Sequence, residues 1–99
     1  MALPIEVDSQ RIAEFCRRHH IRRLALFGSV LRDDFSPASD VDVLVEFEPG
    51  HVPGLAFFRM ETELSQLLGR RADLNTPHFL NPDLRREALA DAEDLYVAA

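Results

Sequence analysis

The segment FGSVLRDDFSPASDVDVLVEF, residues 27–47, carries the clearest structural pattern in the chain. A short apolar run at 23–27 stops at Gly28-Ser29, which predicts a buried strand, because so short a run cannot sustain a helix on its own. After ten intervening residues, Asp40-Val41-Asp42 opens a run in which apolar and polar residues alternate. Residues 40–47 therefore predict a second strand with its valines on one face and both aspartates on the other.

Helices and strands are predicted in alternation on both sides of this segment. The spacing of apolar residues predicts helices at 9–19, 55–68 and 81–89, with one helical turn at 29–32. Short runs predict a third strand at 71–75 and an edge strand at 95–97. This order predicts an α/β (α+β) fold: a small sheet with its helices packed on one face. We expect one domain, residues 1–99, because single cores usually gather roughly 100 to 200 residues.

Composition and charge narrow the classes of function. With 46% hydrophobic and 28% charged residues, the chain has the composition of a soluble globular protein. Its net charge of −6 argues against direct binding of nucleic acid or of an anionic membrane. Neither a signal pattern nor an apolar run of about 18 residues is found, so we expect a cytoplasmic protein. The one cysteine, Cys16, is predicted to be a small buried helix residue.

The turn after the first predicted strand has the composition of a phosphate-binding turn. Gly28 permits a sharp change from strand to helix and a close approach of backbone to a ligand. Ser29 adds a hydroxyl and the N–H groups of a helix start, which suit an anionic phosphate.

Three aspartates predict a metal site beside this turn. Asp40 and Asp42 lie two residues apart on a strand, so their side chains point to the same side, roughly 7 Å apart. Carboxylate ligands select Mg²⁺ or Mn²⁺, and Asp73 on the next strand can complete the site. Three carboxylates that hold two ions suit an in-line phosphoryl displacement.

Other metal sites are disfavoured by the same sequence. An Asp-x-Asp alone is usually a solvated strand end, and it is the preceding Gly-Ser and the flanking strands that favour a nucleotidyl site. A calcium loop of the EF-hand type would need a central glycine and a twelfth-position glutamate, and both are absent. His51 and His78 have no cysteine or histidine partner at zinc spacing, so no zinc site is predicted.

As a set, Gly28-Ser29, Arg32, residues 39–45 (SDVDVLV) and residues 72–74 (ADL) resemble the minimal nucleotidyltransferase (MNT) family of the DNA polymerase beta superfamily. The resemblance covers nearly the whole chain. It implies a polymerase beta-like fold, with a mixed sheet and helices behind it, and the transfer of a nucleoside monophosphate from an NTP with release of pyrophosphate.

The resemblance also implies roles for single residues. Asp40 and Asp42 would hold two Mg²⁺ ions, and Asp73 would ligate the catalytic ion and help to activate the acceptor hydroxyl. Gly28 and Ser29 would bind the triphosphate of ATP. For Arg32, a phosphate contact and a surface ion pair remain equally open. The chain has no lysine, so any further phosphate contact falls to an arginine: Arg22, Arg23, Arg70 or Arg71.

Family members of this length resemble MntA-type antitoxins, which are paired with HEPN-domain ribonuclease toxins and neutralise them by adding AMP to a toxin tyrosine. The resemblance therefore implies a HEPN toxin as partner and a protein adenylyltransferase activity. Two alternatives stay open. One is a catalytically idle module that blocks its partner by contact, and the other is an adenylyltransferase that modifies a small molecule.

Overall fold

The computed structural model describes Ile5 and residues 7–31, 36, 40–51, 53–77 and 80–98. The elements of this part follow in the order α1 (Ser9–Arg18), β1 (Ile21–Phe27), the 3-10 helix η1 (Gly28–Leu31), β2 (Val41–Phe47), α2 (Ala56–Leu68), β3 (Ala72–Asn75), α3 (Pro82–Asp91) and β4 (Glu93–Val97). Each predicted helix and strand is confirmed, with ends that shift by two residues at most. No helix among the described residues is both long and apolar enough to cross a membrane.

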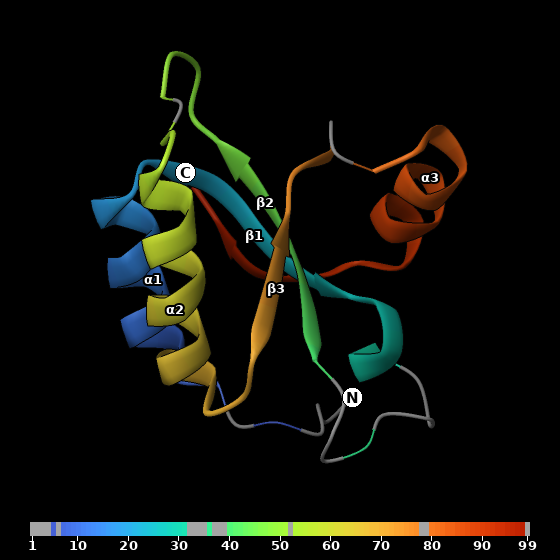
Figure 1. Ribbon diagram of the computed structural model, residues 1–99, viewed down its shortest axis with the longest axis horizontal. Helices are drawn as coiled ribbons and strands as arrows, with labels where there is room; N and C mark the ends of the chain where they lie inside the picture. The colour runs from blue at the N-terminus through green and yellow to red at the C-terminus, as the bar shows by residue number, and fades with distance from the viewer. Residues whose placement is uncertain are drawn as a thin grey trace.

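The four strands form one mixed sheet in the order β3-β2-β1-β4 (Figure 1). Strand β1 runs antiparallel to β2 and to β4, whereas β2 and β3 are parallel. Strand β4 lies at an edge of the sheet, as the sequence predicts. The β1–β2 pairing brings the end of β1 beside the start of β2, because Phe27 pairs with Asp42.

Helices α1 and α2 cover one face of this sheet (Figure 1). The alternation of β2 sends its valines into that layer, where they join apolar residues of both helices. The centre of this core is fully buried and consists of Ile12, Phe15, Leu24, Leu26, Val41, Val43, Val45, Met60 and Leu64. The predicted sheet with helices packed on it is thereby confirmed.

Helix α3 lies against the opposite face, which corrects the expectation that all helices share one face. Its Ala88 packs in a second small cluster with Ala25, Phe27, Leu44 and Leu80. Chain topology explains the difference. The crossover from β2 to β3 through α2 and the crossover from β3 to β4 through α3 run in opposite directions across the sheet. Because parallel crossovers are almost always right-handed, opposite directions place the two helices on opposite faces.

Each helix ends or begins at a residue suited to that position. Asp8 accepts hydrogen bonds from the backbone N–H groups of Gln10 and Arg11 and so caps α1. Asn81 caps α3 in the same way, with Pro82 in the first turn. Helix α2 ends at Gly69, whose φ of 69° is the left-handed conformation expected there.

Candidate functional site

Gly28, Asp42 and Asp73 lie side by side at one end of the sheet. Asp42 is the Cα partner of Phe27 on β1 and of Asp73 on β3. Partner residues on neighbouring strands lie about 4.8 Å apart, and those of a parallel pair point to the same face. The structure thus brings Asp73 beside Asp42, as the sequence predicts, on the face that also carries α3.

Asp40 directly precedes β2, two residues before Asp42. Its Oδ2 atom lies 4.0 Å from Nε of Arg71, the residue that precedes β3, and both side chains are well exposed. Arg71 is therefore a candidate arginine that lies beside an aspartate of this set. Among the described residues, the three that bring ligand atoms within 4.8 Å of one another are His20, Glu48 and His51, not the three aspartates. The side chains of the three aspartates must therefore move for all three to hold one ion.

Gly28 is required by the geometry at this point. Its φ of 76° is a left-handed conformation that residues with a Cβ rarely adopt. A Cβ at this position would overlap the Asp42 carboxylate and lie 3.2 Å from its Cγ. The absent side chain therefore leaves the space that the Asp42 carboxylate occupies. Ser29 follows within η1, whereas its side chain and Arg32 lie outside the described part of the chain.

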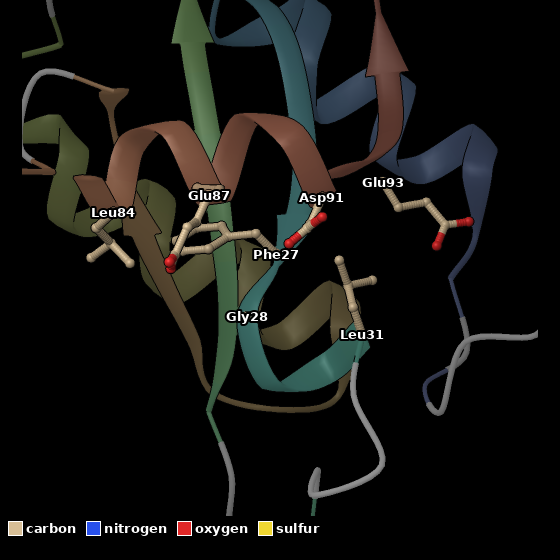
Figure 2. A pocket seen from close by; sticks show the side chains of 8 residues that line it. Phe27, Gly28, Leu31, Leu84, Glu87, Asp91 and Glu93 are labelled. Carbon is tan, nitrogen blue, oxygen red and sulfur yellow. The ribbon is translucent and has the colours of Figure 1, made fainter. Parts of the chain in front are cut away.

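A hollow of about 330 Å³ opens beside Gly28, between η1 and α3 (Figure 2). Phe27, Leu31 and Leu84 supply apolar walls, and carboxylates line the side of α3 and β4 (Figure 2). This volume is at the lower end of the range for small-ligand pockets, about 300 to 1,000 Å³. None of Asp40, Asp42 and Asp73 lines this hollow, and Gly28, which lies against Asp42, connects the hollow to them.

The acidic side chains of this hollow are Glu87, Asp91 and Glu93, which belong to none of the motifs that point to a site in the sequence. Glu87 and Asp91 are four residues apart on α3, a spacing that places both on one helix face. That spacing is visible in the sequence. Because we expected α3 on the same face as α1 and α2, the sequence did not indicate that these two carboxylates line a hollow beside Gly28.

The charges and donor atoms at this end fit a hard divalent cation. Two carboxylates directly opposite one another on adjacent strands repel, so the Asp42–Asp73 pair favours binding of a cation. Oxygen ligands of this kind suit Mg²⁺. The acidic hollow would repel a bare triphosphate but accept one whose charge is neutralised by metal ions. The paired aspartates thus fit a site for a divalent metal ion.

The remaining candidate arginines are engaged elsewhere. Arg22 and Arg23 both contact the Glu46 carboxylate, at 3.2 and 3.5 Å, and Arg23 Nε donates to Asp94 at 2.6 Å. The hydrogen bond to Asp94 outweighs burial and raises the pKa of Arg23. Arg70 donates to the backbone oxygen of Ser36 at 2.6 Å. Arg22 and Arg23 thus contact carboxylates other than Asp40, Asp42 and Asp73.

Cys16 is buried in α1, as predicted. Burial raises the pKa of its thiol to about 12 and outweighs the small opposite effect of Arg17. A thiol with such a pKa is protonated at neutral pH, so Cys16 is a packing residue and not a nucleophile.

Both the sequence and the fold match known nucleotidyltransferases. Residues 9–95 match the nucleotidyltransferase domain family. The protein adenylyltransferase MntA of Thermococcus cleftensis is 35% identical over 79 residues, covering 79% of this chain and 78% of the relative. A solved structure provisionally described as a minimal nucleotidyltransferase has a TM-score of 0.71 at 36% identity, covering 86% of each chain. A complex of a tri-AMPylated Shewanella oneidensis HEPN toxin with an MNT antitoxin shares the fold, with a TM-score of 0.65 at 17% identity, covering 91% of this chain and 70% of that one.

Proposed function

Because the chain belongs to the nucleotidyltransferase domain family, we propose that it is a Mg²⁺-dependent adenylyltransferase that moves AMP from ATP to a tyrosine hydroxyl of a cognate HEPN toxin, and so acts as an antitoxin. The observation that carries the proposal is the in-register pairing of Asp42 with Asp73 beside Gly28. The printed description of the Shewanella oneidensis complex, with an AMPylated HEPN toxin and an MNT antitoxin, supports the choice of partner.

In this proposal Asp40, Asp42 and Asp73 would hold two Mg²⁺ ions. When bound, such ions neutralise charge on the triphosphate and stabilise the transition state of phosphoryl transfer. The chain's own part is to place carboxylates from two parallel strands on one face of the sheet. Loss of one ligand is expected to cost several kcal/mol of transition-state stabilisation, which is a rate loss of roughly a thousandfold.

The transfer itself forms one bond and breaks another. The acceptor oxygen bonds to the α-phosphorus of ATP, and the bond from that phosphorus to the pyrophosphate oxygen breaks. Asp73 is the residue that accepts the proton of the acceptor hydroxyl, since its side chain is exposed and lies beside Asp42. Gly28, Ser29 and Arg32 bind the triphosphate, and Arg71 adds a cation close to Asp40.

The test is Asp42→Asn, assayed as AMP incorporation into a co-expressed HEPN partner by mass spectrometry. We expect the wild-type chain to transfer AMP from ATP when Mg²⁺ is present and the variant to lose at least a hundredfold in rate. The variant should remain folded, because the substitution removes a charge next to Asp73 and leaves the core intact. Transfer at the wild-type rate by Asp42→Asn would refute the proposed site.

Asp94→Asn is the matched control. It makes the same chemical change on the edge strand β4, where the Asp94 carboxylate contacts Arg23. Asp94 is not one of the three aspartates of the proposed metal site. Transfer should be unchanged. If both variants and the wild-type chain neutralise the partner without AMP transfer, the chain is an idle binding module. If AMP transfer needs only the purified chain and a small hydroxyl compound, the acceptor is not a protein.

A further inference from the structure

Two histidines and a glutamate gather at the end of the sheet opposite the aspartates. His20 lies between α1 and β1, and Glu48 and His51 lie in the loop after β2. Their ligand atoms are all within 4.8 Å of one another. The His20 and His51 rings stack, with centroids 3.9 Å apart and planes 12° apart. Residues distant in the sequence are joined here by the pairing of β1 with β2.

Backbone hydrogen bonds join these three residues, which come from two separate segments of the chain. The Glu48 N–H donates to the His20 carbonyl at 2.9 Å, and the His51 N–H donates to the Glu48 carbonyl at 3.1 Å. His20 has a φ of 56°, a left-handed conformation that is uncommon outside glycine. Such backbone conformations concentrate at functional sites, where the surrounding structure maintains them. The backbone conformation of His20 and the hydrogen bond to its carbonyl therefore help to fix the position of its ring.

We propose that His20, Glu48 and His51 form a binding site for Zn²⁺, separate from the nucleotidyltransferase site. Imidazole nitrogen and carboxylate oxygen are both ligands of Zn²⁺, and two histidines with one carboxylate are a common set of three protein ligands. A site of three protein ligands leaves a fourth position for water. Zn²⁺ is selected over Mg²⁺ because imidazole favours transition metals, whereas Mg²⁺ favours oxygen.

A tetrahedral arrangement requires the two stacked imidazole rings to tilt relative to each other, because nitrogen lone pairs lie in the ring planes and parallel rings do not point them at one ion. Zn²⁺ binds nitrogen and oxygen at about 2.0 to 2.2 Å, so ligand atoms around one ion lie about 3.3 Å apart. The present separations of up to 4.8 Å must therefore shorten by about 1.5 Å at most. The three side chains are exposed, so rotation about their χ angles can achieve this without moving the sheet.

The two sites lie far enough apart to be tested separately. Asp42 and Glu48 are six residues apart along β2, which spans about 20 Å at 3.3 Å per residue. Figure 1 shows η1 at one end of the sheet and the loop between β2 and α2 at the other. Occupancy of the zinc site should therefore leave the binding of Mg²⁺ and ATP unchanged.

The test is Zn²⁺ binding to the untagged chain, measured by competition with a chromophoric chelator in excess Mg²⁺. We expect one Zn²⁺ per chain. His20→Asn and His51→Gln should each weaken binding by roughly tenfold or more, since even residues that only support a ligand account for about 10 to 100-fold. Asparagine is chosen at position 20 because it tolerates a positive φ. Circular dichroism checks that each variant is folded.

Two controls separate this site from other ligands in the chain. His19→Gln removes a neighbouring imidazole that contacts Glu63 at 3.1 Å, and Asp42→Asn alters the proposed Mg²⁺ site. Both should retain wild-type Zn²⁺ affinity. Co²⁺ bound to the wild-type chain should show a visible spectrum that is lost in His20→Asn. Absence of one-to-one binding, or equal affinity in wild type and His51→Gln, would overturn the proposal.

Discussion

Alternate residues of β2 point to its two faces, one of which is apolar and buried and the other mostly acidic. Val41, Val43 and Val45 are fully buried beneath α1 and α2. On the other face, only Leu44 is buried, in the cluster that includes Ala88 of α3, and Asp42 lies at the start of the strand. The face covered by α1 and α2 therefore belongs to the main core, while the start of the opposite face carries Asp42 of the proposed site.

Within that second face, the same kind of side chain meets two environments. The Glu46 carboxylate is contacted by Arg22 and Arg23, so its charge is neutralised by the protein itself. Asp42 lies beside a second carboxylate, that of Asp73, and Gly28 leaves room for its side chain. The first arrangement joins β1 to β2, and the second brings together two carboxylates of the proposed metal site. We therefore infer that position on the strand, more than residue type, distinguishes the structural carboxylate from the proposed metal ligands.

The largest effect on stability should follow a change on the face of the sheet that α1 and α2 cover. Leu26 pairs with Val43 on that face and is completely buried. Leu26→Ala should lower the free energy of unfolding by about 3 kcal/mol, through lost apolar burial and a cavity. AMP transfer per folded molecule should persist. Urea unfolding of Leu26→Ala and Asp42→Asn compares the contributions of the two faces to stability. A larger loss of stability in Asp42→Asn than in Leu26→Ala would contradict the difference described between them.

Gly28→Ala should affect both stability and transfer. The added Cβ would be forced into a left-handed conformation and against the Asp42 carboxylate. We expect a loss of about 1 to 2 kcal/mol in unfolding free energy and a loss of AMP transfer beyond what that explains. Gly54→Ala is the matched control, because its φ is also positive and a Cβ there meets no atom within 4 Å. Equal transfer by the two variants would show that the space beside Asp42 is not needed.

The smallest effect concerns the free energy of unfolding at low pH, to which Glu63 of α2 contributes. Burial alone would raise the pKa of Glu63, but hydrogen bonds from Arg18 and His19 outweigh it and hold the pKa below its usual 4.5. A lowered carboxyl pKa contributes stability above pH 4.5 that is lost as pH falls through the folded-state value. Glu63→Gln should therefore lose less stability between pH 5 and 3, by about 0.5 kcal/mol given the solvent exposure. Identical acid curves for the two chains would contradict this.

Much of the fold could be predicted because the decisive signals are local. The alternation in residues 40–47 correctly predicts that the three valines of β2 share one face, which is buried. The start of β1 at Ile21 is not predicted, because Arg22 looks unlike a strand residue and its partner Glu46 is distant in sequence. The side chosen by α3 depends on strand order, which no local pattern contains.

The same distinction applies to the sites. Asp42 and Asp73 could be placed together because each follows a recognisable strand start, so adjacent strands bring them into register. The group formed by His20, Glu48 and His51 could not be predicted, since its members meet only through the β1–β2 pairing. No zinc-type spacing along the chain links His20 with His51, so the sequence alone indicates no site there.

Thermal unfolding with ATP, with and without Mg²⁺, tests most directly whether the paired aspartates form the nucleotide site. The wild-type Tm should rise when both are present, since a ligand that binds only the folded state stabilises it. Asp73→Asn should have a Tm at least equal to wild type without ligand, and should show little or no rise with Mg²⁺ and ATP. A Mg²⁺-dependent rise of the same size in Asp73→Asn would contradict the account.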